Sequence, residues 1–491
     1  MTPRNSAASG KPPVQSAVPD GGHPTEEQLA RQYLQVVRGL HGDEPGRWRA
    51  WERMEDGQAY YRGLPVAFDF LPTLFTPASR RNFASIVETT YGILRKVIHC
   101  YQSDAQFRKL FRFDPRVEEL VLLPSGYEEP LPMARFRLLY NQQTEAFQFC
   151  EFNTDSSSGM LENAEACAAV AESDAFWEFQ SRYPLESRCD EQFEGWAEKL
   201  MAIFRTTAAF KQLQREGQVP HVAIAVCMES PNPDVRELDA YQEIIEDLGW
   251  DCSIYDVRDL RVEDGRLVGR NALAGQNNVP IHLVWRFCIV VDLLKYWDEV
   301  QPFIKAVRTG AVTLVGAFST QIAHDKQLFA LLRHPEVQPL LTFEERAFVE
   351  ERIPFTAFLD DPSLDLEEVR ACPADWVLKP TDWYATKNVT AGAECTTEQW
   401  NRLIDEALAS RDGSPYLVQR FVAPATSPAI PLYGREADFT AAPQPYGNLF
   451  GLYCHCGQFA GVYVRQGPQE VIGSAREGLV APVFWLKNAD E

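Results

Sequence analysis

The segment Cys150-Glu-Phe-Asn-Thr-Asp-Ser-Ser-Ser-Gly159 carries the most informative pattern in this sequence. It continues an apolar, strand-forming run, and side chains two residues apart on a strand point to the same face. Glu151, Asn153 and Asp155 are therefore expected to present their oxygen atoms together. Oxygen ligands of this kind suit a hard cation such as Mg²⁺. The alternative is a solvated strand with a serine-rich turn, which the flanking phenylalanines disfavour.

The residues around this segment predict a hairpin. Ala134–Tyr140 and Ala146–Asn153 have strand character, and the polar stretch Asn141-Gln-Gln-Thr144 between them is typical of a turn. A helix rich in small residues is predicted to follow at about Glu162–Phe176. The candidate oxygen ligands thus lie on the second strand of an antiparallel pair.

The middle of the chain alternates between strands and helices. His221–Cys227 is a short apolar run, Val235–Leu248 has helical spacing, and Cys252–Tyr255 is again strand-like. Two further strands are predicted at Ile281–Arg286 and Ala311–Val315. This alternation favours a βαβ unit with a parallel sheet.

The last third of the chain predicts a different, largely antiparallel arrangement. Strands are expected at Trp376–Lys379, Tyr416–Phe421, Asn448–His455 and Phe459–Arg465. The fold class expected from all three parts is a mixed α/β (α+β) protein.

Three basic residues stand where an anion could be held. Lys379 ends an apolar strand, where a buried ammonium needs an anion such as a nucleotide phosphate. Lys326 opens a predicted helix, Gln327–Leu332, whose first backbone N–H groups can receive an anion. Arg465 ends a strand. The alternatives are a strand-end lysine that reaches solvent and, for Arg465, an ordinary surface position.

Composition narrows the classes of function. The 491 residues include 47 Lys+Arg and 69 Asp+Glu, a net charge of −22. A surface this negative repels phosphate backbones and anionic lipids, so we expect neither nucleic-acid nor membrane partners. No run of 18 apolar residues exists. Residues 1–24 lack an apolar core and are expected to be a disordered tail, and eleven irregularly spaced cysteines favour a reducing, cytoplasmic location.

Taken together, the motifs resemble the glutathionylspermidine synthase family, a branch of the ATP-grasp ligases. The resemblance implies a circularly permuted ATP-grasp fold with an inserted Rossmann-like pre-ATP-grasp domain. The domains would be a tail at 1–24, the N-terminal part of the ATP-grasp unit at 25–214, the βαβ domain at 215–320 and the ATP-binding part at 321–491. The motifs, in order, are Arg137, Glu151-Phe-Asn153-Thr-Asp155, Leu283-Val-Trp-Arg286, Asp325-Lys326, Glu344-Glu345, Val377-Leu-Lys379-Pro380, Leu417-Val-Gln419 and Gly461-Val-Tyr-Val-Arg465.

The resemblance implies an ATP- and Mg²⁺-dependent enzyme that joins a small-molecule carboxylate to an amine through an acyl phosphate. Its site residues carry over by position, and the loop around Tyr384–Val389 would close over the phosphates. The catalytic cations at the γ-phosphate would be Arg137 and Arg465, and Mg²⁺ would be held by Glu151 and Asn153, with Asp155 as a further ligand. The phosphates would be bound by Lys326, Lys379 and Lys387. The adenine would be met by Gln419, Phe421 and Val422.

Two departures from the family pattern leave alternatives open. Leu139 stands where the family has an aspartate metal ligand, so Asp155 or a carboxylate from elsewhere in the chain would have to compensate. The family's glycine-rich phosphate loop is replaced by Tyr-Ala-Thr-Lys387. The alternatives to a ligase are an ATP-grasp phosphotransferase and a non-catalytic nucleotide-binding protein. The sequence names neither the carboxylate nor the amine, nor the oligomeric state.

Overall fold

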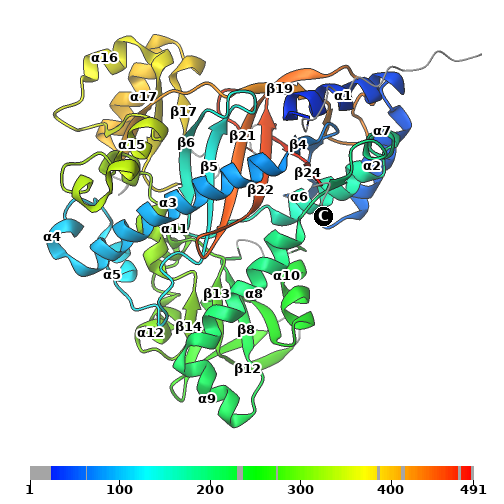
Figure 1. The fold of residues 1–491 in the computed structure, drawn as a ribbon. Coiled ribbons are helices and arrows are strands. Elements are labelled where there is room, and N and C mark those ends of the chain that lie inside the picture. Colours follow the sequence, from blue (N-terminus) through cyan, green and yellow to red (C-terminus); the bar gives the residue numbers. More distant parts are fainter. Residues whose placement is uncertain are drawn as a thin grey trace, which may run out of the picture.

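The computed structural model of the chain describes residues 24–61, 63–228, 236–271, 275–383, 388–410, 415–473 and 477–487. The predicted tail at 1–24 therefore falls, apart from Pro24, outside the described residues. The fold is mixed α/β, with a large sheet at the centre, a parallel sheet below it and a small antiparallel sheet at the upper left of Figure 1. No helix among these ranges is long and apolar enough to cross a membrane.

The large sheet joins two regions that are far apart in the sequence. It has eight strands in the order β20-β3-β23-β22-β21-β5-β6, with β19 paired to β21. In Figure 1 the cyan strands β5 and β6 stand beside the orange and red strands β21 and β22. The predicted hairpin is confirmed, and so is its antiparallel pairing. The strands are β3 (Phe68–Asp69), β5 (Met133–Tyr140), β6 (Phe147–Asn153), β19 (Thr426–Ala429), β20 (Pro431–Leu432), β21 (Gln444–His455), β22 (Gln458–Gly467) and β23 (Leu479–Ala481).

The middle of the chain forms the predicted parallel sheet. Its order is β14-β13-β8-β9, and all three pairings are parallel. All four residues of β13 are buried, as expected for a strand covered on both faces. The elements are α8 (Asp190–Thr206), α9 (Ala208–Glu216), β8 (His221–Val226), α10 (Arg236–Asp247), β9 (Asp251–Asp256), β13 (Leu283–Arg286), α11 (Val290–Lys295), α12 (Gln301–Arg308) and β14 (Thr313–Val315), with a separate ladder of β10 (Arg261–Glu263), β11 (Arg266–Asn271) and β12 (Gln276–Ile281).

The small sheet has its own core. Its order is β15-β18-β16-β17, and every pairing is antiparallel, as predicted for this part of the chain. Trp376 and Trp400 pack with Ile404 and Val418 between the sheet and its helices. The elements are α15 (Phe343–Arg352), β15 (Thr356–Phe358), α16 (Leu366–Ala371), β16 (Trp376–Pro380), β17 (Thr390–Ala391), α17 (Thr397–Ala409) and β18 (Tyr416–Arg420).

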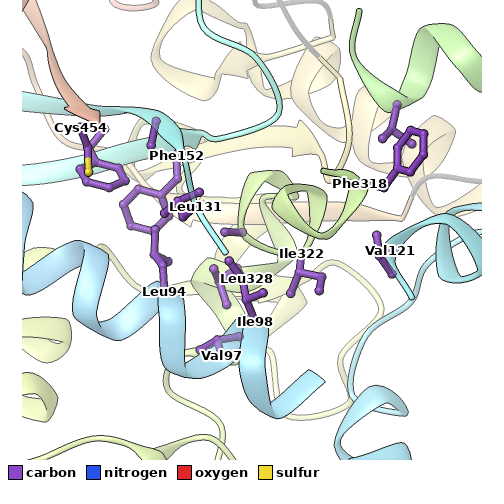
Figure 2. Close-up of a cluster of buried hydrophobic side chains, with 14 of the residues drawn as sticks. Leu94, Val97, Ile98, Val121, Leu131, Phe152, Phe318, Ile322, Leu328 and Cys454 are labelled. Atoms are coloured by element: carbon purple, nitrogen blue, oxygen red, sulfur yellow. The ribbon is translucent and has the colours of Figure 1, made fainter. Parts of the chain in front are cut away.

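One long helix ties the parts together. The 27-residue helix α3 (Pro77–Ser103) crosses in front of the large sheet in Figure 1. Figure 2 shows its residues Leu94, Val97 and Ile98 in a cluster with side chains from the large sheet and from the segment before the small sheet. That segment contains α13 (Gln321–His324) and α14 (Gln327–Leu331), and α4 (Ala105–Arg108) and α5 (Pro115–Val121) follow α3. The core is thus continuous from the large sheet to α13 and α14, the two helices on either side of Lys326.

Helices from the first part of the chain cover the other end of the large sheet. The prediction of one continuous helix at Glu162–Phe176 is wrong, because the chain forms two separate helices there. The side chain of Ser173 accepts the backbone N–H of Phe176 and so caps a new helix. The elements are α1 (Glu26–Gly39), α2 (Glu44–Asp56), β1 (Tyr60–Tyr61), β2 (Leu64–Pro65), β4 (Thr73–Phe75), α6 (Met160–Ala171), α7 (Asp174–Gln180), β7 (Leu185–Glu186) and β24 (Val483–Leu486).

Candidate functional site

A cavity of about 120 Å³ lies between the large sheet and the small sheet. Strands β5, β6 and β21 contribute one wall, and β16 and β18 contribute the other. Its lining contains seven of the residues singled out from the sequence. These are Arg137, Glu151, Lys326, Lys379, Gln419, Phe421 and Val422. The structure therefore brings together residues that span 286 positions of the chain (137 to 422).

Glu151 and Arg137 face each other across the first two strands of this wall. The two residues are register partners on β6 and β5, and Arg137 Nη1 donates to Glu151 Oε1 over 2.8 Å. The register shifts directly after this pair, so Cys150 is an extra residue on β6. The side chains are only 13% and 22% exposed, respectively. The pair is well shielded from water but still opens to the cavity.

Two lysines complete the group. Lys379 Nζ donates to Gln419 Oε1 over 2.7 Å and to the backbone oxygen of Cys150 over 3.1 Å. Lys326 Nζ donates to the backbone oxygen of Trp383 over 2.6 Å and lies 3.8 Å from Glu151 Oε2. Both lysines are nearly fully buried. Their partners are mostly neutral carbonyl groups, so their charges are only partly balanced.

The charges in the cavity are unequal. Burial alone would raise the pKa of Glu151, but Arg137, Lys326 and Lys379 outweigh it and lower that pKa to about 2. Burial lowers the pKa of Lys379 to about 8, with repulsion from Lys326 adding to it. Burial also lowers the pKa of Arg137. The lining sets Arg137, Lys326 and Lys379 against the two carboxylates of Glu151 and Glu470, while Arg420 pairs with Glu368 and Asp375. The cavity therefore has a surplus of positive charge and suits an anion.

Asn153 lies beside this group on the same strand face. It is two residues beyond Glu151 on β6, and its register partner on β5 is Arg135. Its amide nitrogen Nδ2 is buried and has no hydrogen-bond partner among the described residues. Glu151 and Asn153 thus carry their oxygen atoms on one face of β6, although of the two only Glu151 lines the cavity. No group of three His, Cys, Asp or Glu side chains that could hold a metal occurs in the described part of the chain.

Asp155 lies elsewhere, and the expectation that it shares a face with Glu151 is wrong. Strand β6 ends at Asn153, so the alternation of side chains stops before Asp155. Its carboxylate forms a fully buried ion pair with Arg286 of β13 and accepts the backbone N–H of Val290 over 2.7 Å. The Thr320 hydroxyl donates to it over 3.2 Å. With both oxygens used, Asp155 serves to join the parallel sheet to the large sheet.

Arg465 lies next to the cavity rather than in its lining. It is on β22, and its register partner on β21, Leu449, lines the cavity. Its guanidinium donates to the Tyr463 hydroxyl over 2.8 Å and lies 3.3 Å from Glu162 Oε2. Burial would lower the pKa of Arg465, but Tyr463 and Glu162 raise it above its usual range. Arg465 and Glu151 are therefore on the same face of the large sheet, and their strands, β22 and β6, are three strands apart in its order.

Part of the backbone that was expected to contact an adenine is already hydrogen-bonded within the protein. The Phe421 N–H donates to the backbone oxygen of Asp375 over 2.8 Å. The Gln419 side chain bridges Lys379 and Thr356. Phe421 and Val422 still line the cavity. Lys387 lies outside the described residues, as do the three residues before it.

The structure does not have the anion site that was expected at the first backbone N–H groups of the helix after Lys326. Helix α14 has only five residues, and the backbone N–H of Gln327 donates to Asp325 Oδ1 over 3.0 Å. The Asp325 carboxylate therefore occupies the position where an anion was expected. Lys326 reaches the cavity through its side chain instead.

Several lining residues carried no signal in the sequence. Leu139, which the sequence marked only as a departure from the aspartate of the family, also lines the cavity. The others come from connections between elements, where no strand or helix pattern indicates which way a side chain points. They include Glu470, Val471 and Ile472, whereas Val389 belongs to the loop that was expected to close over the phosphates.

The sequence matches no protein-family model and no curated protein. Among solved structures, the chain resembles the apo form of a glutathione synthetase-like effector from Globodera pallida, with a TM-score of 0.57 and 11% identity over 95% of this chain and 98% of that one. A putative gamma-glutamylcysteine synthetase from Methylobacillus flagellatus matches with a TM-score of 0.37 and 10% identity over 79% and 84% of the two chains, too low to establish a shared fold. The chain therefore has a mixed α/β fold similar to that of the glutathione synthetase-like effector.

Proposed function

We propose that this chain is an ATP-dependent carboxylate–amine ligase of the glutathionylspermidine synthase type. The observation that supports it best is the convergence of Arg137, Lys326 and Lys379 on Glu151 in a cavity between two sheets. A cavity with a surplus of buried cations is suited to a polyphosphate. The likeness to a glutathione synthetase-like effector agrees with this class of activity. The circular permutation of the ATP-grasp fold, and the division at 25–214, 215–320 and 321–491, are parts of the same proposal.

The roles of the residues follow from their positions. Lys379 and Lys326 would bind the nucleotide phosphates, and Lys387 is proposed as a third phosphate ligand from the sequence alone. Arg137 would turn from Glu151 to the phosphoryl group during its transfer to the carboxylate, stabilising the charge that develops there. Arg465, beside the cavity, would approach the same group. An amine then displaces phosphate from the acyl phosphate, and an amide forms.

Magnesium fits the residues that are present, provided that the nucleotide supplies most of its ligands. Mg²⁺ in nucleotide sites is commonly held by one or two side-chain oxygens together with phosphates and water. The carboxylate of Glu151 and the side-chain amide oxygen of Asn153, two residues apart on β6, can supply two such groups. When bound, the ion supplies charge neutralisation at the phosphates. Asp155 is left out of this set because Arg286 and Val290 occupy its oxygens.

The adenine is proposed to lie at the apolar end of the cavity. Phe421 and Val422 are part of the lining, and Ile472 faces the same space. At about 120 Å³ the cavity is smaller than the roughly 300–1,000 Å³ of typical ligand pockets. Binding of a whole nucleotide therefore requires the two walls to separate. Gln419 would act as a positioning residue, because its amide holds Lys379.

The decisive experiment is mass spectrometry of reactions with ATP, Mg²⁺ and pooled small carboxylates, amino acids, peptides and polyamines. An amide product formed together with ADP supports the ligase, and a stable phosphorylated product supports the phosphotransferase instead. The non-catalytic alternative is favoured by Leu139 in the lining, and it predicts ATP binding without any product.

Binding can be tested even before a substrate is known. Mg·ATP is expected to raise the melting temperature of the full chain by mass action. Lys379→Ala should abolish most of that rise while it leaves the melting temperature without ligand nearly unchanged. Lys305→Ala, which removes an exposed lysine on α12, is the matched control and should respond as the parent does. An equal ATP-induced rise in the Lys379 variant would remove this lysine from the site.

A further inference from the structure

A second and larger cavity, of about 540 Å³, lies on the other side of the large sheet. Helix α1 contributes Glu26 and Leu34 to its wall, and the approach to β4 contributes Leu71. The far wall includes Asn448 of β21 and Gln466 of β22. Its volume falls within the range of roughly 300–1,000 Å³ that is typical of small-molecule pockets. None of the residues assigned to the nucleotide cavity takes part in it.

The strand geometry explains why the two cavities are separate. Asn448 and Gln466 are register partners, and so are their neighbours Leu449 and Arg465. Successive side chains on a strand point to opposite faces of the sheet. Leu449 lines the nucleotide cavity, whereas Asn448 lines the second cavity. The same two strands therefore serve both spaces.

The lining of the second cavity includes a buried carboxylate that has no cationic partner among the described residues. Glu26 is only 8% exposed, and its Oε1 accepts the Ser79 hydroxyl and, over 3.3 Å, the Thr76 backbone N–H. Within the described ranges, no lysine, arginine or histidine pairs with Glu26. The one arginine in the lining, Arg31, pairs with Glu27 over 2.6 Å. Burial raises the pKa of Glu26 to about 7, so a cationic partner would stabilise its ionised form.

Another part of the lining is a network of neutral polar side chains. Gln466 Nε2 donates to the Ser427 hydroxyl over 2.9 Å and to Asn448 Oδ1 over 3.0 Å. The Ser427 hydroxyl also lies 3.0 Å from Asn448 Oδ1, so the three side chains hold one another in place. Leu34 and Leu71 add apolar surface to the lining. The cavity thus combines a carboxylate, apolar side chains and a hydrogen-bonding network.

We propose that this second cavity binds a small primary amine. Its ammonium group would pair with Glu26, its alkyl part would lie along Leu34 and Leu71, and a polar group at its far end would meet Gln466. The carboxylate attracts an ammonium and repels an acid, the leucines favour an alkyl chain over a strongly hydrated ion, and the amide network favours a hydrogen-bonding tail. This site is independent of the proposed ligase activity and does not require it.

The test uses 5-aminopentan-1-ol as the probe, with pentane-1,5-diol as its neutral analogue, titrated into the full chain by calorimetry. We expect the amine to bind and the diol to bind at least about 10-fold more weakly, since a buried charged hydrogen bond is lost. Glu26→Gln should weaken amine binding by about 10-fold or more and bring it close to that of the diol. The matched control Glu44→Gln removes the same charge from the first residue of α2, outside the cavity, and its amine binding should stay within about 2-fold of the parent.

A second variant tests the proposal in case Glu26→Gln does not fold. Leu34→Trp fills the cavity from α1 without touching the carboxylate, and it should abolish binding while thermal melting shows an intact fold. Titration in the presence of Mg·ATP should give the same affinity, which separates this site from the nucleotide cavity. Equal binding of amine and diol, unchanged binding in Glu26→Gln, or no binding of the amine by the folded parent would each overturn the proposal.

Discussion

Two charge clusters that lie four residues apart in the chain have opposite properties. Glu151 lies with Arg137, Lys326 and Lys379 in a cavity that has more cations than anions, and the side chains of Glu151 and Arg137 are partly accessible. Asp155 faces a single arginine, Arg286, in a fully buried pair whose charges balance. Every oxygen of Asp155 has a partner inside the protein.

This difference separates a site from a structural link. A balanced and fully bonded pair has no capacity left for a ligand, and its removal leaves an uncompensated buried charge. A cluster with surplus cations is incomplete in the free protein and becomes complete when an anion binds. Glu151 and Asp155 belong to the same short acidic motif, and they differ in role because different residues surround them.

The largest effect is expected at the structural pair. Arg286→Met should lower the free energy of unfolding by about 3–5 kcal/mol, because Asp155 is left buried without its cation. Urea unfolding of the full chain measures this loss. Arg137→Met removes an arginine of the same kind from a partly accessible pair, and it should cost about 1 kcal/mol or less. The comparison fails if the Arg137 variant is the less stable of the two.

The next effect concerns catalysis. Glu151→Gln keeps the shape of the side chain but removes its charge, so it should lower turnover by about 100-fold while nucleotide binding changes little. ADP release with a productive substrate pool provides the measurement. In Asp155→Asn, turnover per folded molecule should remain near that of the parent, although less folded protein is recovered. Normal turnover in Glu151→Gln would refute its role at the phosphates.

The smallest effect is a pH dependence. Because burial lowers the pKa of Lys379 to about 8, the free site loses this positive charge as the pH rises through 8. Below that pH the lysine is protonated and can bind a phosphate, so Mg·ATP affinity should fall by about 10-fold between pH 7 and pH 9. Lys379→Arg keeps its charge over this range and should flatten the profile. An unchanged slope in that variant would assign the titration to another group.

Much of the fold could be predicted from local patterns. The hairpin of β5 and β6, the parallel sheet in the middle of the chain and the antiparallel strands near its end all follow from the spacing of apolar residues. The break between α6 and α7 was missed because the helical spacing continues through Ser173, whereas its hydroxyl starts a new helix there. A local hydrogen bond of this kind is invisible to periodicity.

The site was only partly predictable, because identity and position in a motif do not specify contacts. The sequence by itself determined that Lys379 stands at the end of a strand, where it could bind an anion, and that Glu151 stands on a strand where it could hold a cation. The role of Arg137 came from the family resemblance. The tertiary structure alone decided that Asp155 is joined to Arg286 and that β21 and β22 pair beside β5. It also decided that Glu26 is buried without a cation. Local pattern reports periodicity within one segment, whereas charge balance depends on which distant segments pack together.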